Sequence, residues 1–428
     1  MLGFKNNNLL VKVTSANTLL VAARTLFSII TQKALAILVG AEGISVIGNL
    51  RNILSFLENF TIIGVSNGLI KYVSQYKNDK ENLSKLFSTI FVFSVFACIF
   101  SFIILLVYSN AISDFIFGVE NDFSFIIQIL AFILPFIAIN SVLNALVNGL
   151  SDYKGFTKVI LLTSILGSII VVTCAYQNGL FGGLLAITLI PFIQFISYLM
   201  LLSKSSWHQI KVKDLKWKIP FKKQLLSYSF MSLIVILFIN LIDILLRDLI
   251  ENKVSLAEAG YWTAMNSISK NYMQFSAALF PLYILPQYAK IKDTLGYRKE
   301  VSKIYKMLLP LLILGLLGIY FAREFIIRVL YSEDFLSMAP LFKWQLVGDF
   351  VKFIAIVLAY QFLAKKQVFN FIFTELLSVG LFYVFSVYFL NDFGTEGVVM
   401  ANLLRYIVYL IVVCFILRHN FFSNKEIN

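Results

Sequence analysis

Seven basic side chains lie well inside the long apolar runs of this 428-residue chain. They are Arg24, Lys33, Arg51, Arg247, Lys270, Lys352 and Arg405. Each would cost about 2.5–3.5 kcal/mol at the centre of a lipid-facing helix, so we expect these cations to face the protein interior or a watery cavity. The acids in the same runs are fewer, namely Glu58, Asp243, Asp248, Asp349 and Glu375. The excess of about two positive charges predicts a cavity that holds an anion.

Helical spacing groups some of these residues in the first half of the chain. The first apolar run carries one polar stripe at helical spacing, made of Asn17, Arg24, Ser28 and Thr31. Arg51 and Glu58 are seven residues apart and share a face of the second run. For Arg24 and Arg51 we favour contact with a ligand, because a guanidinium fork can donate two hydrogen bonds to one phosphate. A purely structural role is the alternative for both.

The second half offers a similar set. The eighth run has a polar side with a cation near the middle of the membrane, formed by Asn266, Ser269, Lys270 and Gln274. Asp349 and Lys352 are three residues apart on the tenth run, so they either neutralise each other or face the cavity. We expect internal pairs of Arg405 with Glu375, and of Arg247 with its acidic neighbours. The candidate substrate-binding residues are Asn17, Arg24, Ser28, Arg51, Glu58, Asn266, Lys270, Asp349 and Lys352.

Motifs for covalent or nucleotide chemistry are absent from the sequence. There is no G-x-x-x-x-G-K-[ST] loop for ATP and no G-x-G-x-x-G after a strand. His208 and His419 lack the spacing of metal ligands. Cys98, Cys174 and Cys414 fall inside apolar runs, where we expect buried small hydrophobes. We therefore expect no cofactor, no metal and no catalytic residue.

The composition predicts an all-α integral membrane protein. Hydrophobic residues make up 59% and charged residues only 14% of the chain, and its mean hydropathy is +0.84. A soluble protein would carry about 25% charged residues. No cleaved signal peptide is apparent at the N-terminus, so the first span should act as the targeting signal. Reading apolar runs of about twenty residues as spans gives twelve, at 15–40, 44–72, 86–108, 124–150, 156–177, 182–202, 225–249, 257–288, 302–322, 339–363, 367–390 and 395–418.

Basic loops orient these spans. The central stretch 203–224 carries seven lysines and one acid, Asp214. Counted with Lys158, Lys303 and Arg418 at the ends of the spans, the loops on its side of the membrane hold 23 Lys and Arg, whereas the opposite side holds three, Lys253, Arg323 and Arg328. This bias predicts that both termini are cytoplasmic. It also explains the net charge of +13 without nucleic acid. The basic stretch is expected to touch anionic lipid head groups, with a specific partner site as the alternative.

The chain therefore divides into a six-helix lobe at 1–203, a basic cytoplasmic linker at 204–224 and a second six-helix lobe at 225–428, around a central cavity. Two lobes that enter the membrane in the same orientation are expected for a parallel repeat. A weak internal similarity supports a repeat. Gln75-Tyr76 and Gln287-Tyr288 lie 212 positions apart, and Lys154 and Lys366 have the same separation.

Three segments resemble a known family. They are WQLVGDFVK at 344–352, SNGLIKYVSQY at 66–76 and YWTAMNSISKNYMQF at 261–275. They resemble the Wzx-type flippases of O-antigen and enterobacterial common antigen, in the superfamily that also holds the multidrug exporters and the lipid II flippases. This resemblance implies a transporter that moves an undecaprenyl-diphosphate-linked oligosaccharide from the cytoplasmic to the periplasmic leaflet of the bacterial inner membrane by alternating access. Related lipid II flippases have an arginine-bearing cavity, and Arg24 and Arg51 match that pattern here.

Two other functions stay open at this point. A cation-coupled multidrug exporter would share the fold, but organic cations would favour carboxylates and aromatics over the excess of Arg and Lys. A membrane polymerase of lipid-linked sugars would need a large extramembrane loop or a cluster of catalytic acids. The expected partners are the lipid-linked oligosaccharide and membrane lipids, with the polymerase and chain-length regulator of the assembly system as candidates. No nucleic acid is expected, and one chain with both lobes could work as a monomer.

Overall fold

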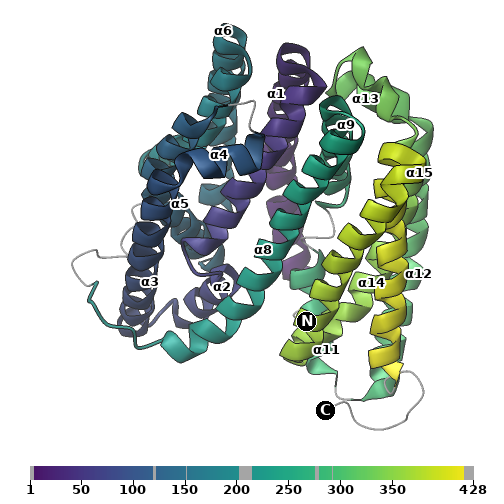
Figure 1. Cartoon of the computed structure of the whole chain (residues 1–428). Helices are drawn as coiled ribbons and strands as arrows, with labels where there is room; N and C mark the ends of the chain where they lie inside the picture. Colours follow the sequence, from purple (N-terminus) through teal and green to yellow (C-terminus); the bar gives the residue numbers. More distant parts are fainter. Residues whose placement is uncertain are drawn as a thin grey trace. The chain divides into compact units, whose positions relative to one another are not determined.

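The computed structural model describes residues 4–118, 122–150, 152–201, 215–274, 279–291 and 293–418, and these residues are almost entirely helical (Figure 1). The side chains of residues 4–24 lie outside the description, as do most of the central basic stretch and the last ten residues. In chain order the helices are α1 (Phe4–Phe60), α2 (Ser66–Tyr76), α3 (Lys80–Val107), α4 (Ser109–Phe117), α5 (Ser124–Gly149), α6 (Tyr153–Leu201), α8 (Lys222–Lys253), α9 (Leu256–Tyr272), η2 (Phe280–Ile284), α11 (Leu285–Lys290), α12 (Thr294–Phe321), α13 (Arg323–Leu330), η3 (Glu333–Met338), α14 (Leu341–Ala364) and α15 (Val368–Ile416).

Seven helices in the described part are long and apolar enough to cross a membrane. They lie within α1, α3, α5, α6, α12, α14 and α15. The predicted spans at 86–108, 124–150 and 339–363 agree with α3, α5 and α14 to within a few residues, apart from the earlier start of α3. The all-helical membrane class predicted from composition is therefore confirmed.

The three longest helices each contain a break at a glycine. Gly40 in α1, Gly179 in α6 and Gly394 in α15 have φ values of 67°, 56° and 56°. Only glycine adopts this left-handed region without strain, so each break is fixed by the sequence. The breaks lie at the ends of predicted spans, so each of these helices consists of two helical segments.

One predicted span is wrong in extent. The span expected at 44–72 is interrupted after Phe60, where Ile63 and Gly64 both have positive φ, and α2 then starts at Ser66. A Cβ on Gly64 would lie 2.9 Å from the side chain of Leu233, so the turn is also tightly packed. The span expected at 257–288 contains α9, which ends at Tyr272, and also η2 and α11, which follow residues 275–278 outside the description. Apolar composition alone conceals the interruption at Ile63 and Gly64.

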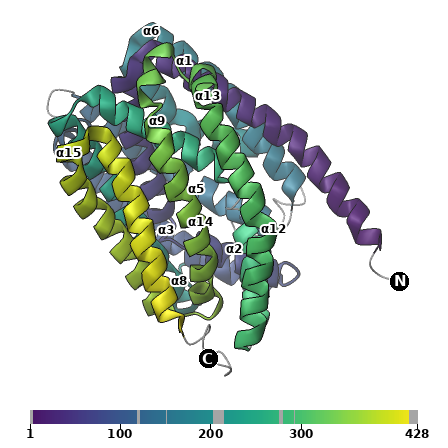
Figure 2. The same ribbon diagram turned by 90° about the vertical axis from the view of Figure 1, so that its right-hand side faces the viewer.

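The chain forms two compact units. The first contains residues 1–39 and 49–240, and the second contains residues 40–48 and 241–428. In the first unit, α5 packs against α2, α3, α4 and α6 (Figure 1). In the second unit, α14 packs against α9, α11, α12 and α15, and Figure 2 shows α12, α14 and α15 in the foreground. Each unit is thus built around one apolar helix.

Helix lengths repeat along the chain. Both α3 and α12 have 28 residues and start 214 positions apart, at Lys80 and Thr294. Both α6 and α15 have 49 residues and start 215 positions apart, at Tyr153 and Val368. The lengths of these two pairs of helices therefore recur at an offset of 214 or 215 residues, close to the 212 expected from the sequence.

Local chemistry repeats at the same offset. Asp79 caps α3 by accepting from Asn82 N at 3.0 Å, and Asp293 caps α12 by accepting from Gly296 N at 2.9 Å. The Asn82 N–H also holds the pKa of the Asp79 carboxyl below its usual value. An acidic cap suits a helix N-terminus because it satisfies a free backbone donor. The repeat is thus visible in the helix ends as well as in the helix lengths.

Candidate substrate-binding site

A buried carboxylate joins α9 to α14 in the second unit. Asp349 is completely buried, and its Oδ2 accepts from Ser269 Oγ at 2.6 Å and from Gln345 Nε2 at 3.1 Å. The hydroxyl of Tyr272 donates to the same oxygen. Gln345 Nε2 also lies 3.2 Å from Ser269 Oγ, so three neutral side chains surround one acid. The other carboxylate oxygen, Oδ1, is buried and has no hydrogen-bond partner among the described residues.

Two cations, one of them three residues after Asp349, lie over the ring of Tyr406. The ammonium of Lys352 on α14 is 5.4 Å from the ring centroid of Tyr406, and the guanidinium of Arg405 on α15 is 4.5 Å from the same centroid. Arg405 also lies 4.0 Å from the ring of Phe382, and its Nη2 is 3.0 Å from the Tyr406 hydroxyl oxygen. Its Nε is buried, and in the described part of the chain no acceptor reaches it. Aromatic faces stabilise these cations without neutralising them.

The expected internal pair of Arg405 with Glu375 is not formed. Both side chains are described, and no N–O distance of 4.0 Å or less joins them. Glu375 Oε1 accepts from Tyr409 OH at 2.9 Å instead. Asp349 and Lys352, both also described, form no ion pair either, and the neutral donors at Asp349 all reach its Oδ2. The positive charges of Lys352 and Arg405 are therefore not paired directly with an acid.

Arg247 has surroundings typical of a structural cation. It is buried, its Nε donates to Thr263 Oγ1 at 2.8 Å, and its Nη1 donates to the backbone oxygen of Asp243 at 3.1 Å. Its guanidinium also lies 5.3 Å from the ring centroid of Trp262. The carboxylate of Asp243 lies 3.6 Å from the ammonium of Lys270. The sequence did not predict this ion pair. It places a carboxylate beside Lys270, which the sequence suggested for contact with the ligand.

The remaining candidates are less closely grouped. Lys270 has a side chain that is 69% exposed despite its pair with Asp243, and Asn266 is half-buried one turn earlier on α9. Arg51 and Glu58 are both exposed on the part of α1 that belongs to the first unit. Ser28 is exposed on the same helix before its break. Asn17 and Arg24 lie on α1, but their side chains fall outside the described residues.

Sequence reasoning missed the neutral partners in the second unit. Gln345 lies one helical turn before Asp349, and Tyr272 lies three residues after Ser269, so helical spacing could have grouped them. The role of Tyr406 depends on contacts between α14 and α15, which no local pattern reveals.

Cys414, expected to be buried, is exposed on α15, whereas Cys98 and Cys174 are half-buried. Among the described residues no group of His, Cys, Asp and Glu could hold a metal ion.

This arrangement brings two cations and a buried donor together, which suits an anionic group. Lys352 and Arg405 supply two positive charges, and the Arg405 Nε is a buried donor without an acceptor among the described residues. Charge-assisted hydrogen bonds to a phosphate or carboxylate would satisfy such a donor. The described side chains are therefore compatible with the binding of an anion.

Comparison with known proteins gives consistent matches. A family model described as "Polysaccharide biosynthesis protein" matches residues 34–340. The chain is 30% identical over 400 residues to the "Lipid III flippase" of Escherichia coli (strain K12), a match that covers 92% of this chain and 95% of that protein. The protein of the same name from Shigella flexneri matches equally well.

Solved structures match over nearly the whole chain at low identity. An inward-facing multidrug resistance MATE family transporter has a TM-score of 0.72 at 14% identity, covering 94% of this chain and 96% of that one. The lipid II flippase MurJ, in an inward closed conformation, has a TM-score of 0.69 at 14% identity, covering 95% and 87%. An outward-facing MATE transporter has a TM-score of 0.66 at 15% identity, covering 95% and 94%. These likenesses show a shared fold.

Proposed function

Because the chain belongs to the polysaccharide biosynthesis protein family, we propose that it is a flippase for an undecaprenyl-diphosphate-linked oligosaccharide. It is a multi-pass protein of the bacterial inner membrane and a transporter, not an enzyme. The observation that carries this function is the 30% identity, over 92% of the chain, to proteins named Lipid III flippase. Its cargo would cross from the cytoplasmic to the periplasmic leaflet and would carry an O-antigen or enterobacterial common antigen repeat unit.

The proposed architecture has twelve spans with both termini in the cytoplasm. Six spans form a lobe at 1–203 and six form a lobe at 225–428, joined by the basic linker at 204–224. The repeated lengths of α3 and α12, and of α6 and α15, support two equivalent lobes. The likeness to transporters in inward-facing and outward-facing states supports alternating access between the lobes.

Cations in both lobes would hold the diphosphate. In the first lobe these are Arg24 and Arg51, and in the second they are Lys352 and Lys270. The two charges on the ring of Tyr406 support a role for Lys352, since no described carboxylate pairs with it. A diphosphate cannot cross hydrocarbon unassisted, and charged donors in a cavity would replace its hydration. The polar side chains proposed to complete the cavity are Asn17, Ser28, Glu58, Asn266 and Asp349.

The membrane potential would supply the driving force. With the inside negative, outward movement of an anion is favoured by about 2.3 kcal/mol per charge per 100 mV, so transport needs no ATP. The same field would hold the unliganded cationic cavity facing inward. Neutralisation by the diphosphate would then release it to face outward. The protein would act as a monomer, with the polymerase and chain-length regulator of the assembly system as partners.

Reconstitution into vesicles tests whether the protein transports a lipid-linked oligosaccharide. The purified protein is placed in vesicles with a labelled undecaprenyl-diphosphate oligosaccharide, and exposure of the label on the opposite leaflet is followed with and without an imposed potential. Protein-dependent crossing that accelerates with an inside-negative potential is expected. Crossing of organic cations without crossing of the lipid-linked sugar would contradict the proposal and identify a multidrug exporter with the same fold.

A further inference from the structure

The segment that leads into α8 alternates apolar and basic residues. We call residues Leu215–Lys223 the strap. Its apolar residues are Leu215, Trp217, Ile219 and Phe221, and its basic residues are Lys216, Lys218, Lys222 and Lys223. The strap contains no acid, and all four lysines are exposed. The strap therefore combines apolar side chains with four exposed positive charges.

Backbone hydrogen bonds fix the strap on α3. Lys216 N donates to Ser88 Oγ at 3.0 Å, and Phe221 N donates to Thr89 Oγ1 at 3.3 Å. Ser88 and Thr89 are buried neighbours on the third turn of α3. Because two adjacent hydroxyls accept from both ends of the strap, its path over the helix is defined.

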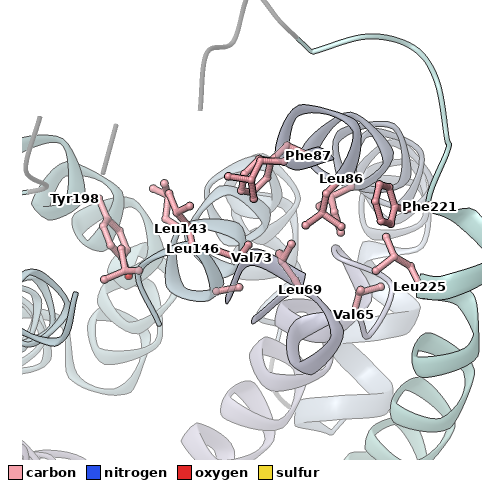
Figure 3. Close-up of a cluster of buried hydrophobic side chains, with 14 of the residues drawn as sticks. Val65, Leu69, Val73, Leu86, Phe87, Leu143, Leu146, Tyr198, Phe221 and Leu225 are labelled. Atoms are coloured by element: carbon pink, nitrogen blue, oxygen red, sulfur yellow. The ribbon is translucent and has the colours of Figure 1, made fainter. Parts of the chain in front are cut away.

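Phe221 anchors the strap in a hydrophobic core. Its side chain is 7% exposed, and its ring centroid lies 5.9 Å from that of Tyr72 and 5.7 Å from that of Tyr76, both on α2. Figure 3 shows Phe221 and Leu225 among the buried side chains of this cluster, which includes Leu86. Burial of this ring holds the lysines on the outside of the first unit.

Trp217, by contrast, is exposed and contacts an exposed apolar stripe on α3. It is 67% exposed and makes an edge-to-face contact with Phe91 on α3, with the ring centroids 5.5 Å apart. Phe91 begins a run of exposed apolar side chains along α3 that continues through Phe96, Ile99, Phe100, Ile103 and Val107. In a membrane protein such a stripe faces lipid. Tryptophan is typical of the end of such a stripe, at the level of the head groups.

We propose that the strap is a binding surface for anionic phospholipids, with Trp217 inserted at the membrane interface and the four lysines on the lipid phosphates. Lysines near an anionic membrane surface are attracted to its phosphates. An acidic protein would use the same charges, but the position of Trp217 at the end of the lipid-facing stripe favours lipid. With the proposed topology this is the cytoplasmic leaflet. The inference is independent of the cargo and concerns how the start of α8 is held.

Quenching by brominated lipid tests the proposal in the full-length protein. Nanodiscs of phosphatidylcholine receive the same small mole fraction of either brominated phosphatidylglycerol or brominated phosphatidylcholine. The signal of Trp217 is the difference between wild type and Trp217→Phe. We expect at least about twofold stronger quenching by the anionic lipid, because four lysines enrich it locally. Equal quenching by the two lipids, or no quenching of Trp217 by either, would overturn the proposal.

Control measurements distinguish the effect of the strap lysines from the effect of the protein's overall positive charge. Replacing Lys216, Lys218, Lys222 and Lys223 by Gln should abolish the preference while quenching by the neutral lipid persists. The matched variant replaces four exposed lysines of the second unit, Lys290, Lys299, Lys306 and Lys366, and should keep the preference. Wild-type protein in 1 M KCl should lose the preference for the anionic lipid, since the screening length falls to about 3 Å. A preference that survives both the strap variant and high salt would also overturn the proposal.

Discussion

The hydroxyl of Ser269 on α9 donates a 2.6 Å hydrogen bond to Asp349 Oδ2 on α14. With Gln345 and Tyr272 it surrounds a carboxylate that has no exposure to solvent. Burying a charge is costly unless hydrogen bonds compensate, so these donors allow the acid to remain at this position. The contact also fixes α9 against the helix at the centre of the second unit.

Asp349 variants should differ in stability according to whether the donors keep an acceptor. Asp349→Asn retains a carbonyl oxygen for Ser269 and Gln345, whereas Asp349→Leu leaves buried donors unsatisfied at about 1–3 kcal/mol each. We expect the melting temperature of the purified protein to fall much further for Leu than for Asn. Val347→Leu, at an exposed position of the same helix, is the control. Equal melting of the Leu variant and wild type would refute the structural role of the cluster.

Gly260 should not tolerate a side chain. A Cβ at this position on α9 would overlap the backbone carbonyl of Ala41, which cannot rotate away. Overpacking of this kind costs about 1–3 kcal/mol, so Gly260→Ala should lower the melting temperature and the folded yield. Gly315→Ala on α12, where a Cβ meets nothing within 4 Å, should be neutral or slightly stabilising. Comparable melting of the two variants would argue against the close packing of α9 on residues 40–48.

Phe221→Ala should release the strap from the first unit. Loss of a buried phenylalanine costs about 3–5 kcal/mol, and here the loss falls on a short segment fixed by few other contacts. Trypsin should then cut after Lys216 and Lys218 several times faster than in wild type, as measured by mass spectrometry of the fragments. Ile219→Ala, at a more exposed position of the strap, should change the rate little. Unchanged cleavage in the Phe221 variant would show that this ring is not the anchor.

Lys352→Gln should slow transport more than removal of a nearby cation that lies outside the proposed cavity. A hydrogen bond to a charged group contributes about 1.5–3 kcal/mol, which corresponds to roughly 10- to 150-fold in rate if it acts at the limiting step. Lys343→Gln is the matched control, because Lys343 is exposed on the same helix and stacks over Trp344. The readout is the initial rate of lipid-linked oligosaccharide crossing. Equal rates for the two variants would remove Lys352 from the proposed site.

Much of the helical framework was predictable because it depends on local sequence. Apolar runs of the right length located α3, α5 and α14, and glycines fixed the breaks at Gly40, Gly179 and Gly394. The family resemblance carried by the WQLVGDFVK segment is confirmed by the family match and by the 30% identical flippases. The interruption at Ile63 and Gly64 was missed, since one tight turn changes hydropathy very little.

The candidate site was less predictable because its partners come from distant parts of the chain. Helical spacing left two alternatives for Asp349 and Lys352, namely mutual neutralisation or a place in the cavity. In the structure they form no ion pair, and Asp349 accepts from Ser269 on another helix. Arg405 was expected to pair with Glu375, but it lies over the rings of Phe382 and Tyr406. Count and sign of charges can be read from a sequence, but pairing depends on which helices pack together. The roles of Arg24 and Arg51 stay predictions.

The most direct test of the account is the rate at which labelled undecaprenyl-diphosphate oligosaccharide crosses vesicles containing the Arg24→Gln, Arg51→Gln double variant. Loss of crossing is predicted, with membrane insertion and melting temperature unchanged, because the diphosphate would lose the charged donors that replace its hydration. Arg323→Gln, which removes an arginine stacked on Tyr320 outside the proposed cavity, should transport at the wild-type rate. Wild-type crossing by the double variant would contradict the claim that these cations hold the cargo.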